Sequence, residues 1–146
     1  MQNENYDALR LENQLCFPLY ACAREVMKRY KPALDELDLT YTQYVTMMVL
    51  WEKPEVTSKE IGERLHLDSG TLTPVIKKLA EKGLVTRRRA SEDERNLVVT
   101  LTDEGLMLRD RAVGIPAQMG QCLRLAPEDA QTLYRILYQM LEELGE

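Results

Sequence analysis

Three cysteines, at positions 16, 22 and 122, are the residues of this sequence with the most distinctive chemistry. Their spacing contains no Cys-x-x-Cys pair, matches no zinc site and does not make the disulfide framework of a small secreted protein. Reversible thiol oxidation is the chemistry that remains open to them. Only a thiolate reacts readily with an oxidant, so a reactive cysteine needs hydrogen-bond donors or positive charge beside it. Without such neighbours, a lone cysteine in an apolar helix is a small buried hydrophobic residue.

The helix that would position Cys16 is predicted from about Tyr6 to Tyr30, because apolar residues recur there at helical spacing. Tyr20 and Tyr30 fall on the same stripe as Cys16 and are candidate donors to its thiol. Pro18 lacks an amide donor, and we expect it to kink or loosen the helix near Cys16. Cys16 would lie too far along this helix for its N-terminal dipole to act strongly.

Helical geometry limits which of these side chains can meet within one chain. Tyr30 is 14 residues beyond Cys16, which is about 21 Å along a straight helix. A contact between them would therefore require Tyr30 of another chain. Cys22 lies about 9 Å from Cys16 by the same rise, so these two cysteines cannot form a disulfide without unwinding the helix.

The stretch from Thr57 to Thr102 predicts a winged helix-turn-helix. Its first helix opens with a predicted capping box of Thr57 and Glu60, flanked by the hydrophobic staple of Val56 and Ile61. The second helix carries an inward apolar stripe and ends at Gly83, a left-handed cap. That stripe consists of Leu72, Val75, Ile76 and Leu79. A further helix, from Thr42 to about Trp51, is expected to pack beneath this pair, with Tyr41 and Tyr44 flanking its start.

The outward face of the second helix combines hydroxyl groups near its start with lysines further along. Threonine can contact base edges or thymine methyl groups in a major groove, and lysine neutralises phosphates. This face contains Thr71, Thr73, Pro74, Lys77 and Lys78. Two strands of period two follow, and the polar connection between them can place Arg95 in a minor groove. The alternative is that Lys77 to Arg95 is only a solvated charged face.

Charge is distributed unevenly along the sequence. The chain of 146 residues has a formal charge of −5, whereas Lys77 to Arg89 holds six basic residues and one acidic residue, a local +5 that leaves −10 for the remainder. A basic face on an acidic body favours binding to nucleic acid at that face.

The composition predicts one globular domain, and the absence of a signal peptide or long apolar run predicts a cytoplasmic protein. His66, the single histidine, is expected to have a packing or hydrogen-bonding role and not to bind a metal.

Several motifs resemble those of a known family. The run Asp93-x-Arg95-x-x-x-Val99-x-Leu101-Thr102-x-x-Gly105 resembles the wing signature of the MarR family of bacterial transcription regulators, and LHLDSGTLTPVIKKL resembles its recognition-helix segment. The segments LENQLCFPLY and LTYTQYVTMMVLWE are similar to the organic hydroperoxide resistance regulators within that family. The resemblance covers nearly the whole chain.

This resemblance implies a mainly α fold with a small β-hairpin, a homodimer and a repressor that binds pseudo-palindromic operator DNA. It implies that Cys16 senses organic hydroperoxides, with tyrosines of the other subunit donating to it and Cys122 as a possible resolving cysteine. The implied thiol environment comprises Phe17, Tyr20, Tyr30 and Tyr41. The implied DNA contacts are Ser69, Thr71, Thr73, Pro74, Lys77, Lys78, Arg88, Asp93 and Arg95. No cofactor or metal is implied.

The terminal helices should support the dimer. After Thr102 a helix is expected that Gly114 and Pro116 interrupt, with Cys122 in the following loop and a last helix starting at Pro127. The first and last helices have more apolar surface than a small core can cover, so we predict a winged helix-turn-helix region at 42–102 and helical dimerisation regions at 6–38 and 103–146 within one chain, 1–146. The alternative is a monomer whose terminal helices fold back.

Alternatives also remain for the function. The chain could be a regulator of this family that responds to another oxidant, such as hypochlorite, or to a small phenolic ligand. A thiol peroxidase or reductase that uses Cys16 and Cys122 is a different class, against which stand the missing Cys-x-x-Cys pair and the complete DNA-reading module. We therefore predict a regulator and not an enzyme.

Overall fold

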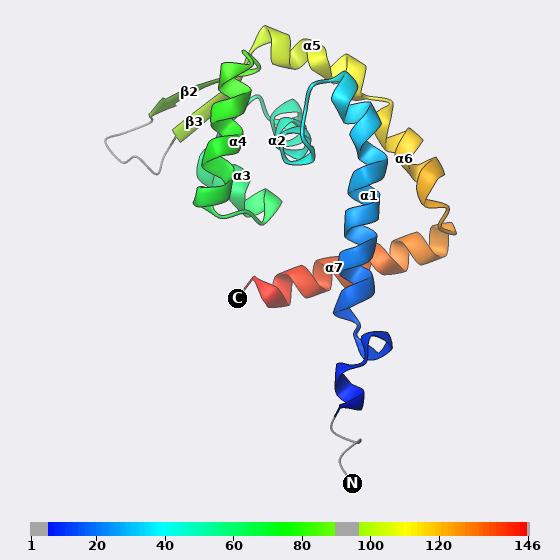
Figure 1. Cartoon of the computed structure of the whole chain (residues 1–146). Coiled ribbons are helices and arrows are strands. Elements are labelled where there is room, and N and C mark those ends of the chain that lie inside the picture. The colour runs from blue at the N-terminus through cyan, green and yellow to red at the C-terminus, as the bar shows by residue number, and fades with distance from the viewer. Residues whose placement is uncertain (1–5, 90–96, 146) are drawn as a thin grey trace.

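The computed structural model describes residues 6–89 and 97–145. These residues form a mainly helical fold with one antiparallel sheet of strand order β1-β3-β2 (Figure 1). In chain order the elements are η1 Asp7–Leu9, η2 Leu11–Asn13, α1 Cys16–Glu36, α2 Tyr41–Glu52, β1 Glu55–Thr57, α3 Ser58–Leu65, α4 Ser69–Glu81, β2 Val85–Arg89, β3 Leu97–Leu101, α5 Asp103–Ala112, α6 Ile115–Leu123 and α7 Pro127–Leu144. The predicted winged helix-turn-helix is confirmed: α3 and α4 are the two helices, and β2 and β3 are the hairpin.

The sheet has one strand more than the predicted hairpin. β1 pairs with β3, with Val56 opposite Val99 and Thr57 opposite Val98. This strand is only three residues long and directly precedes α3, so its sequence carries too few residues to show a period of two. Its pairing holds the start of α3 against the hairpin.

The core lies where α2, α3 and α4 meet the sheet. Its completely buried apolar side chains are Met47, Leu50, Ile61, Ile76, Leu79 and Val99. The predicted stripe of α4 faces this core, since Leu72, Ile76 and Leu79 are buried and Val75 packs against them half-buried. Gly83 follows α4 with φ +78°, the left-handed conformation that the sequence predicted for this cap.

Helix α3 is capped as predicted by the Thr57 hydroxyl, which accepts from the Glu60 amide at 3.1 Å. The predicted return bond from the Glu60 carboxylate is absent among the hydrogen bonds of the described residues, and that carboxylate instead lies 3.3 Å from Lys53. A complete capping box occurs at the start of α2, where Thr40 and Gln43 bond to each other's backbone amides at 3.1 and 3.2 Å.

The prediction of a helix from Tyr6 to Tyr30 was wrong at its first end and too short at its second. Two 3-10 turns occupy residues 7–13, and α1 begins only at Cys16. Pro18 is consequently the third residue of α1, where an amide has no intrahelical acceptor and a proline causes no kink. The helix also continues past Tyr30 to Glu36 and contains Pro32 in its interior.

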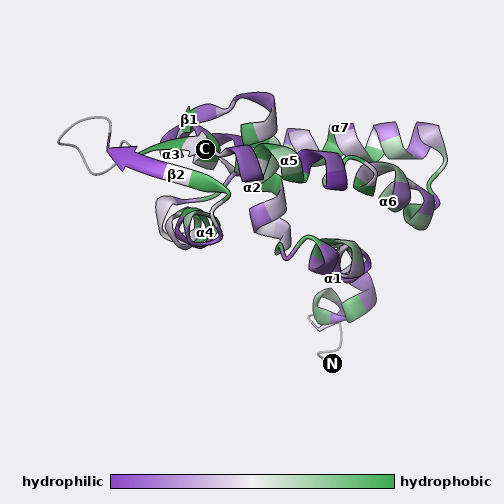
Figure 2. Ribbon diagram, turned by 90° about the horizontal axis from the view of Figure 1, so that it is seen from above, coloured by the Kyte–Doolittle hydropathy of each residue, from purple (hydrophilic) through white to green (hydrophobic). Residues whose placement is uncertain are grey.

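The C-terminal helices expose much of their apolar surface. The predicted interruption at Gly114 and Pro116 is confirmed, because α5 ends at Ala112 and α6 begins at Ile115. Helix α7 contains no buried residue. Figure 1 shows the first half of α1 and much of α7 extending beyond the winged helix-turn-helix, and Figure 2 shows apolar residues on α1, α6 and α7 as well as in the core. Leu15 and Leu144 are 82% and 77% exposed. No helix among the described residues is long and apolar enough to cross a membrane.

Candidate nucleic-acid interface and thiol site

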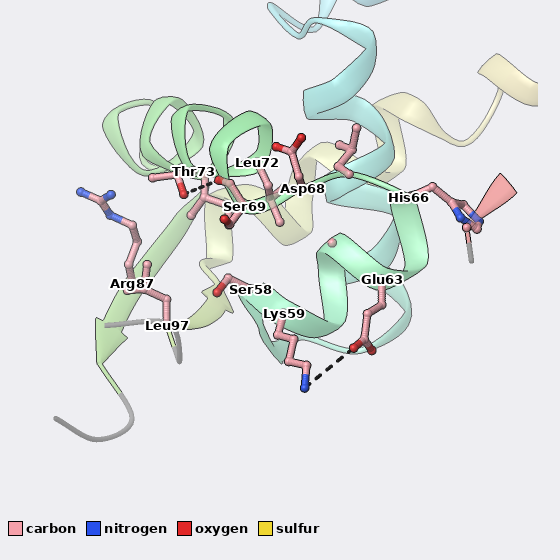
Figure 3. A pocket seen from close by; sticks show the side chains of 14 residues that line it. Ser58, Lys59, Glu63, His66, Asp68, Ser69, Leu72, Thr73, Arg87 and Leu97 are labelled. Carbon is pink, nitrogen blue, oxygen red and sulfur yellow. Dashed lines mark hydrogen bonds and ion pairs between the residues drawn. The ribbon is translucent and has the colours of Figure 1, made fainter. Parts of the chain in front are cut away.

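The N-terminal end of α4 presents the predicted DNA-reading hydroxyls on the surface. Asp68 caps the helix by accepting from the Thr71 amide at 2.7 Å, and this hydrogen bond holds the pKa of the Asp68 carboxyl below its usual value. Ser69, Thr71 and Thr73 are exposed in the first turns. The Thr73 hydroxyl donates to the Ser69 carbonyl at 2.6 Å, which turns its lone pairs outward as acceptors (Figure 3).

The basic side of α4 follows one turn further along. Pro74, Lys77 and Lys78 are exposed, as expected. Lys78 has Glu81 of the same helix 3.8 Å away, an exposed pair that leaves the ammonium group available to another anion.

Residues of α3, α4 and the hairpin line a hollow of about 770 Å³, together with Gly145 after α7. His66, which takes the left-handed conformation at φ +55°, ends α3 and lines this hollow from the turn between the helices. Its side chain is exposed and does not pack in the core, and the turn uses its left-handed backbone conformation. Arg87 and Leu97 line the opposite wall (Figure 3).

Strand register places the arginines of β2 on different faces. Val85 and Arg87 lie opposite Leu101 and Val99, so Arg87 shares the face of buried Val85, on the side of α4. Arg88 lies on the other face and pairs with Glu55 of β1 at 3.1 Å. Arg87 was not among the predicted DNA contacts, although alternation from the apolar Val85 could have indicated its direction. Asp93 and Arg95 lie outside the described residues.

Thr102 and Gly105, the last residues of the wing motif, connect the hairpin to α4 and α2 by hydrogen bonds. The Thr102 hydroxyl donates to the Gly83 carbonyl at 2.7 Å and accepts from the Gly105 amide at 3.1 Å. The Trp51 indole donates to the Gly105 carbonyl at 2.9 Å. A Cβ atom at Gly105 would stand 2.2 Å from the Leu84 carbonyl oxygen. Glycine is therefore required here by close backbone approach.

The candidate sensing cysteine lies at the very start of α1. Cys16 is the first helical residue and is exposed, as are Cys22 and Cys122. The expectation that it would lie too deep for the helix dipole was wrong, because the unexpected 3-10 turns shift the helix start to this residue. Phe17 and Tyr20 beside it are 42% and 60% exposed. Cys122, expected in a loop, lies in the last turn of α6.

Tyrosines gather at the other end of α1. The rings of Tyr30 and Tyr41 meet edge to face with centroids 5.0 Å apart, and Tyr44 lies 6.0 and 6.1 Å from them. We call Tyr30, Tyr41 and Tyr44 the tyrosine cluster. Burial raises the pKa of all three hydroxyls, so they remain protonated donors at neutral pH. Tyr44, which is 3% exposed, belongs to this cluster but was not among the predicted thiol environment.

One chain does not bring the cluster to its own Cys16. Both Cys16 and Tyr30 belong to the continuous helix α1, so their 14-residue separation corresponds to about 21 Å. No group of histidine, cysteine, aspartate and glutamate able to hold a metal occurs among the described residues. Within one chain, the Cys16 thiol and the hydroxyl groups of the tyrosine cluster thus lie far apart.

Comparisons with known proteins find transcription regulators. Residues 28–111 match the family described as "Transcriptional regulator SarA/Rot". The chain is 47% identical over 144 residues to the organic hydroperoxide resistance transcriptional regulator of Bacillus subtilis (strain 168), a match that covers 99% of this chain and 97% of that protein.

Two solved structures of a further regulator are also similar. Reduced AbfR bound to DNA has a TM-score of 0.77 at 34% identity, covering 97% of this chain and 99% of that one. Disulfide-formed AbfR has a TM-score of 0.68 at 34% identity, covering both chains fully at 100%. AbfR comes from Staphylococcus epidermidis.

Proposed function

The chain belongs to the MarR family of transcription regulators, in the branch of the organic hydroperoxide resistance regulators, and we propose that it is a homodimeric repressor that releases its operator when Cys16 is oxidised. The observation that carries this proposal is the separation, within one chain, of the exposed Cys16 thiol at the start of α1 from the tyrosine cluster that α1 and α2 form together, in a chain with a winged helix-turn-helix. The similar regulator AbfR is known both in a reduced form bound to DNA and in a disulfide form.

The DNA interface combines α4 with the hairpin. Ser69, Thr71, Thr73 and Pro74 face the major groove from the first turns of α4, and Lys77 and Lys78 contact phosphates. Arg88 reaches the DNA backbone from β2, and Asp93 and Arg95 complete the proposed set, with the Arg95 guanidinium contacting the minor groove. Arg87 joins this set because it lines the hollow between α4 and the hairpin.

The second copy of the chain supplies what one copy lacks. α7 is amphipathic and buries none of its residues, and the start of α1 exposes Leu15, Leu19 and Tyr20. Burying these faces against the same faces of a second copy removes apolar surface from water in a two-fold arrangement. Residues 6–38 and 103–146 are thus the dimerisation regions on either side of the DNA-binding region 42–102.

The dimer also completes the sensing site. Cys16 of one subunit meets Tyr30 and Tyr41 of the other, whose protonated hydroxyls donate to the thiolate. Phe17 and Tyr20 form the apolar wall that admits an organic hydroperoxide. The position of Cys16 in the first turn of α1 adds the positive end of the helix dipole to these donors.

The chemistry at this site is peroxide cleavage followed by disulfide formation. The Cys16 thiolate attacks the terminal oxygen of the hydroperoxide, an S–O bond forms, the O–O bond breaks and an alcohol leaves after protonation. The resulting sulfenic acid is attacked by the Cys122 thiolate of the other subunit, which forms an S–S bond and releases water. Loss of the tyrosine hydrogen bonds to Cys16 then alters the dimer and with it the spacing of the two recognition helices.

Substitution of Cys16 by serine tests this function. We expect Cys16→Ser to bind operator DNA like the wild type and to stay bound after cumene hydroperoxide, when the wild type dissociates. Cys22→Ser is the matched control, because it removes an exposed thiol from the same helix and should leave release unchanged. Operator binding by fluorescence anisotropy, with mass spectrometry of each cysteine, provides the measurement. Normal release by Cys16→Ser would contradict the proposed function.

A further inference from the structure

Lys82, which follows α4, uses its side chain differently from the other lysines of the recognition helix. Its ammonium group reaches the turn between α1 and α2, donates to the Gln43 side-chain oxygen at 3.0 Å and to the Asp38 carbonyl, and lies 3.7 Å from the Asp38 carboxylate. Its side chain is 26% exposed, against 67% for Lys78 one turn earlier. Lys82 is therefore a bridge between elements and not part of the solvated basic face.

The turn that receives Lys82 is tightly built. Gln43 is 6% exposed, and its side-chain oxygen also accepts from the Thr40 amide at 3.1 Å as part of the capping box of α2. Asp38 is in the left-handed conformation at φ +54°, and the Leu39 amide bonds back to the Leu34 carbonyl at the end of α1. Lys82 consequently links the end of α4 to the turn that follows α1, through Asp38, and to the first turn of α2, through Gln43.

The start of α2 also carries two members of the tyrosine cluster, Tyr41 and Tyr44. Tyr41 directly follows the Thr40 cap, and Tyr44 directly follows Gln43. Both rings lie against Tyr30 of α1, while the neighbouring Gln43 side chain bonds Lys82. Because a hydrogen-bonded helical turn moves as a unit, displacement of Tyr41 must also shift the acceptors of Lys82.

We propose that Lys82 is the positioning residue that couples the tyrosine cluster to the recognition helix, so that oxidation at Cys16 alters DNA affinity through the Lys82 bridge. This inference rests on the proposed function and names the residue that transmits the effect of Cys16 oxidation to the recognition helix α4. A hydrogen bond from a charged donor changes an equilibrium by roughly tenfold or more. Such a bond formed in only one state of the dimer is large enough to carry much of a typical allosteric coupling, which spans about fivefold to 150-fold.

The test compares the ratio of operator dissociation constants after and before cumene hydroperoxide among wild type and variants. We expect a ratio of about a hundred for the wild type and of about ten or less for Lys82→Met, which keeps the aliphatic stem without the donor. Lys82→Arg retains a cationic donor and should stay within about threefold of the wild-type ratio. The matched control is Lys78→Met, which should weaken binding in both states equally because its only bridge among the described residues is to Glu81 of its own helix.

The outcomes separate this inference from the function on which it rests. A wild-type ratio near one overturns the proposed function and this inference together. A full wild-type ratio that persists in Lys82→Met overturns the role of Lys82 alone. Thermal unfolding checks that the variants fold. Should Lys82→Met fail to fold, Lys82→Gln shortens the side chain and removes its charge, so that it loses the bridge to both Asp38 and Gln43, and an unchanged ratio in that variant would equally refute the bridge.

Discussion

Replacement of Gly105 by alanine should damage the joint between the hairpin and the helices. The added Cβ would stand 2.2 Å from the Leu84 carbonyl oxygen and 2.7 Å from the Leu101 side chain, so the start of α5 must move. That movement strains the bonds of Thr102 to Gly83 and of Trp51 to the Gly105 carbonyl, which are 2.7 and 2.9 Å long. Overpacking costs about 1–3 kcal/mol and each weakened hydrogen bond about 1 kcal/mol. We therefore expect a loss of about 3–5 kcal/mol in the free energy of unfolding.

The measurement is urea unfolding followed by the fluorescence of Trp51, the single tryptophan, which reports directly on this joint. Gly120→Ala is the matched control, because nothing lies within 4 Å of a Cβ at this helical position. It should stabilise the protein by up to about 1 kcal/mol. If Gly105→Ala unfolds within about 0.5 kcal/mol of the wild type, the required close approach is refuted.

Four further predictions concern the cap of α4, DNA binding and resolution of the oxidised thiol. Because the folded pKa of Asp68 lies below its usual value of 3.8, the ionised Asp68 cap stabilises the fold fully above that pH, and this stabilisation is lost as the pH falls through the lowered pKa. The melting-temperature advantage of the wild type over Asp68→Asn should therefore shrink below pH 3.8. A difference that stays constant with pH would argue against the ionised cap. The double alanine variant of Lys77 and Lys78 should reduce the slope of log affinity against log salt by roughly 0.9 per phosphate contact, and an unaltered slope would remove both from the interface. Arg95→Ala should weaken operator binding with the dimer intact by analytical ultracentrifugation, whereas unchanged affinity at physiological salt would contradict the minor-groove role. Cys122→Ser should still be oxidised at Cys16 but lose the intersubunit disulfide on non-reducing gels, and a persisting dimer band would assign the second sulfur elsewhere.

Local features of the sequence determined the DNA-binding half of this protein. The stripe of α4, the cap at Thr57 and the left-handed Gly83 each depend on residues within one or two helical turns, so their spacing alone predicted them. The period of two after Gly83 likewise predicted β2 and β3. The resemblance to the hydroperoxide regulators pointed to Cys16, Tyr30 and Tyr41 without any knowledge of their positions in space.

Tertiary structure decided the features that depend on residues far apart in the sequence. Whether α1 starts at Tyr6 or at Cys16 is not encoded by apolar spacing alone, and only the observed helix places Cys16 in its first turn. Glu60 could have closed a capping box but pairs with Lys53 seven residues away, and Lys82 reaches Gln43 across 39 residues of sequence. Membership of Tyr44 in the tyrosine cluster is fixed by the packing of α2 on α1. The physical reason is that caps and stripes are satisfied within a segment, whereas a charged side chain or a buried ring selects among partners that only folding brings within reach.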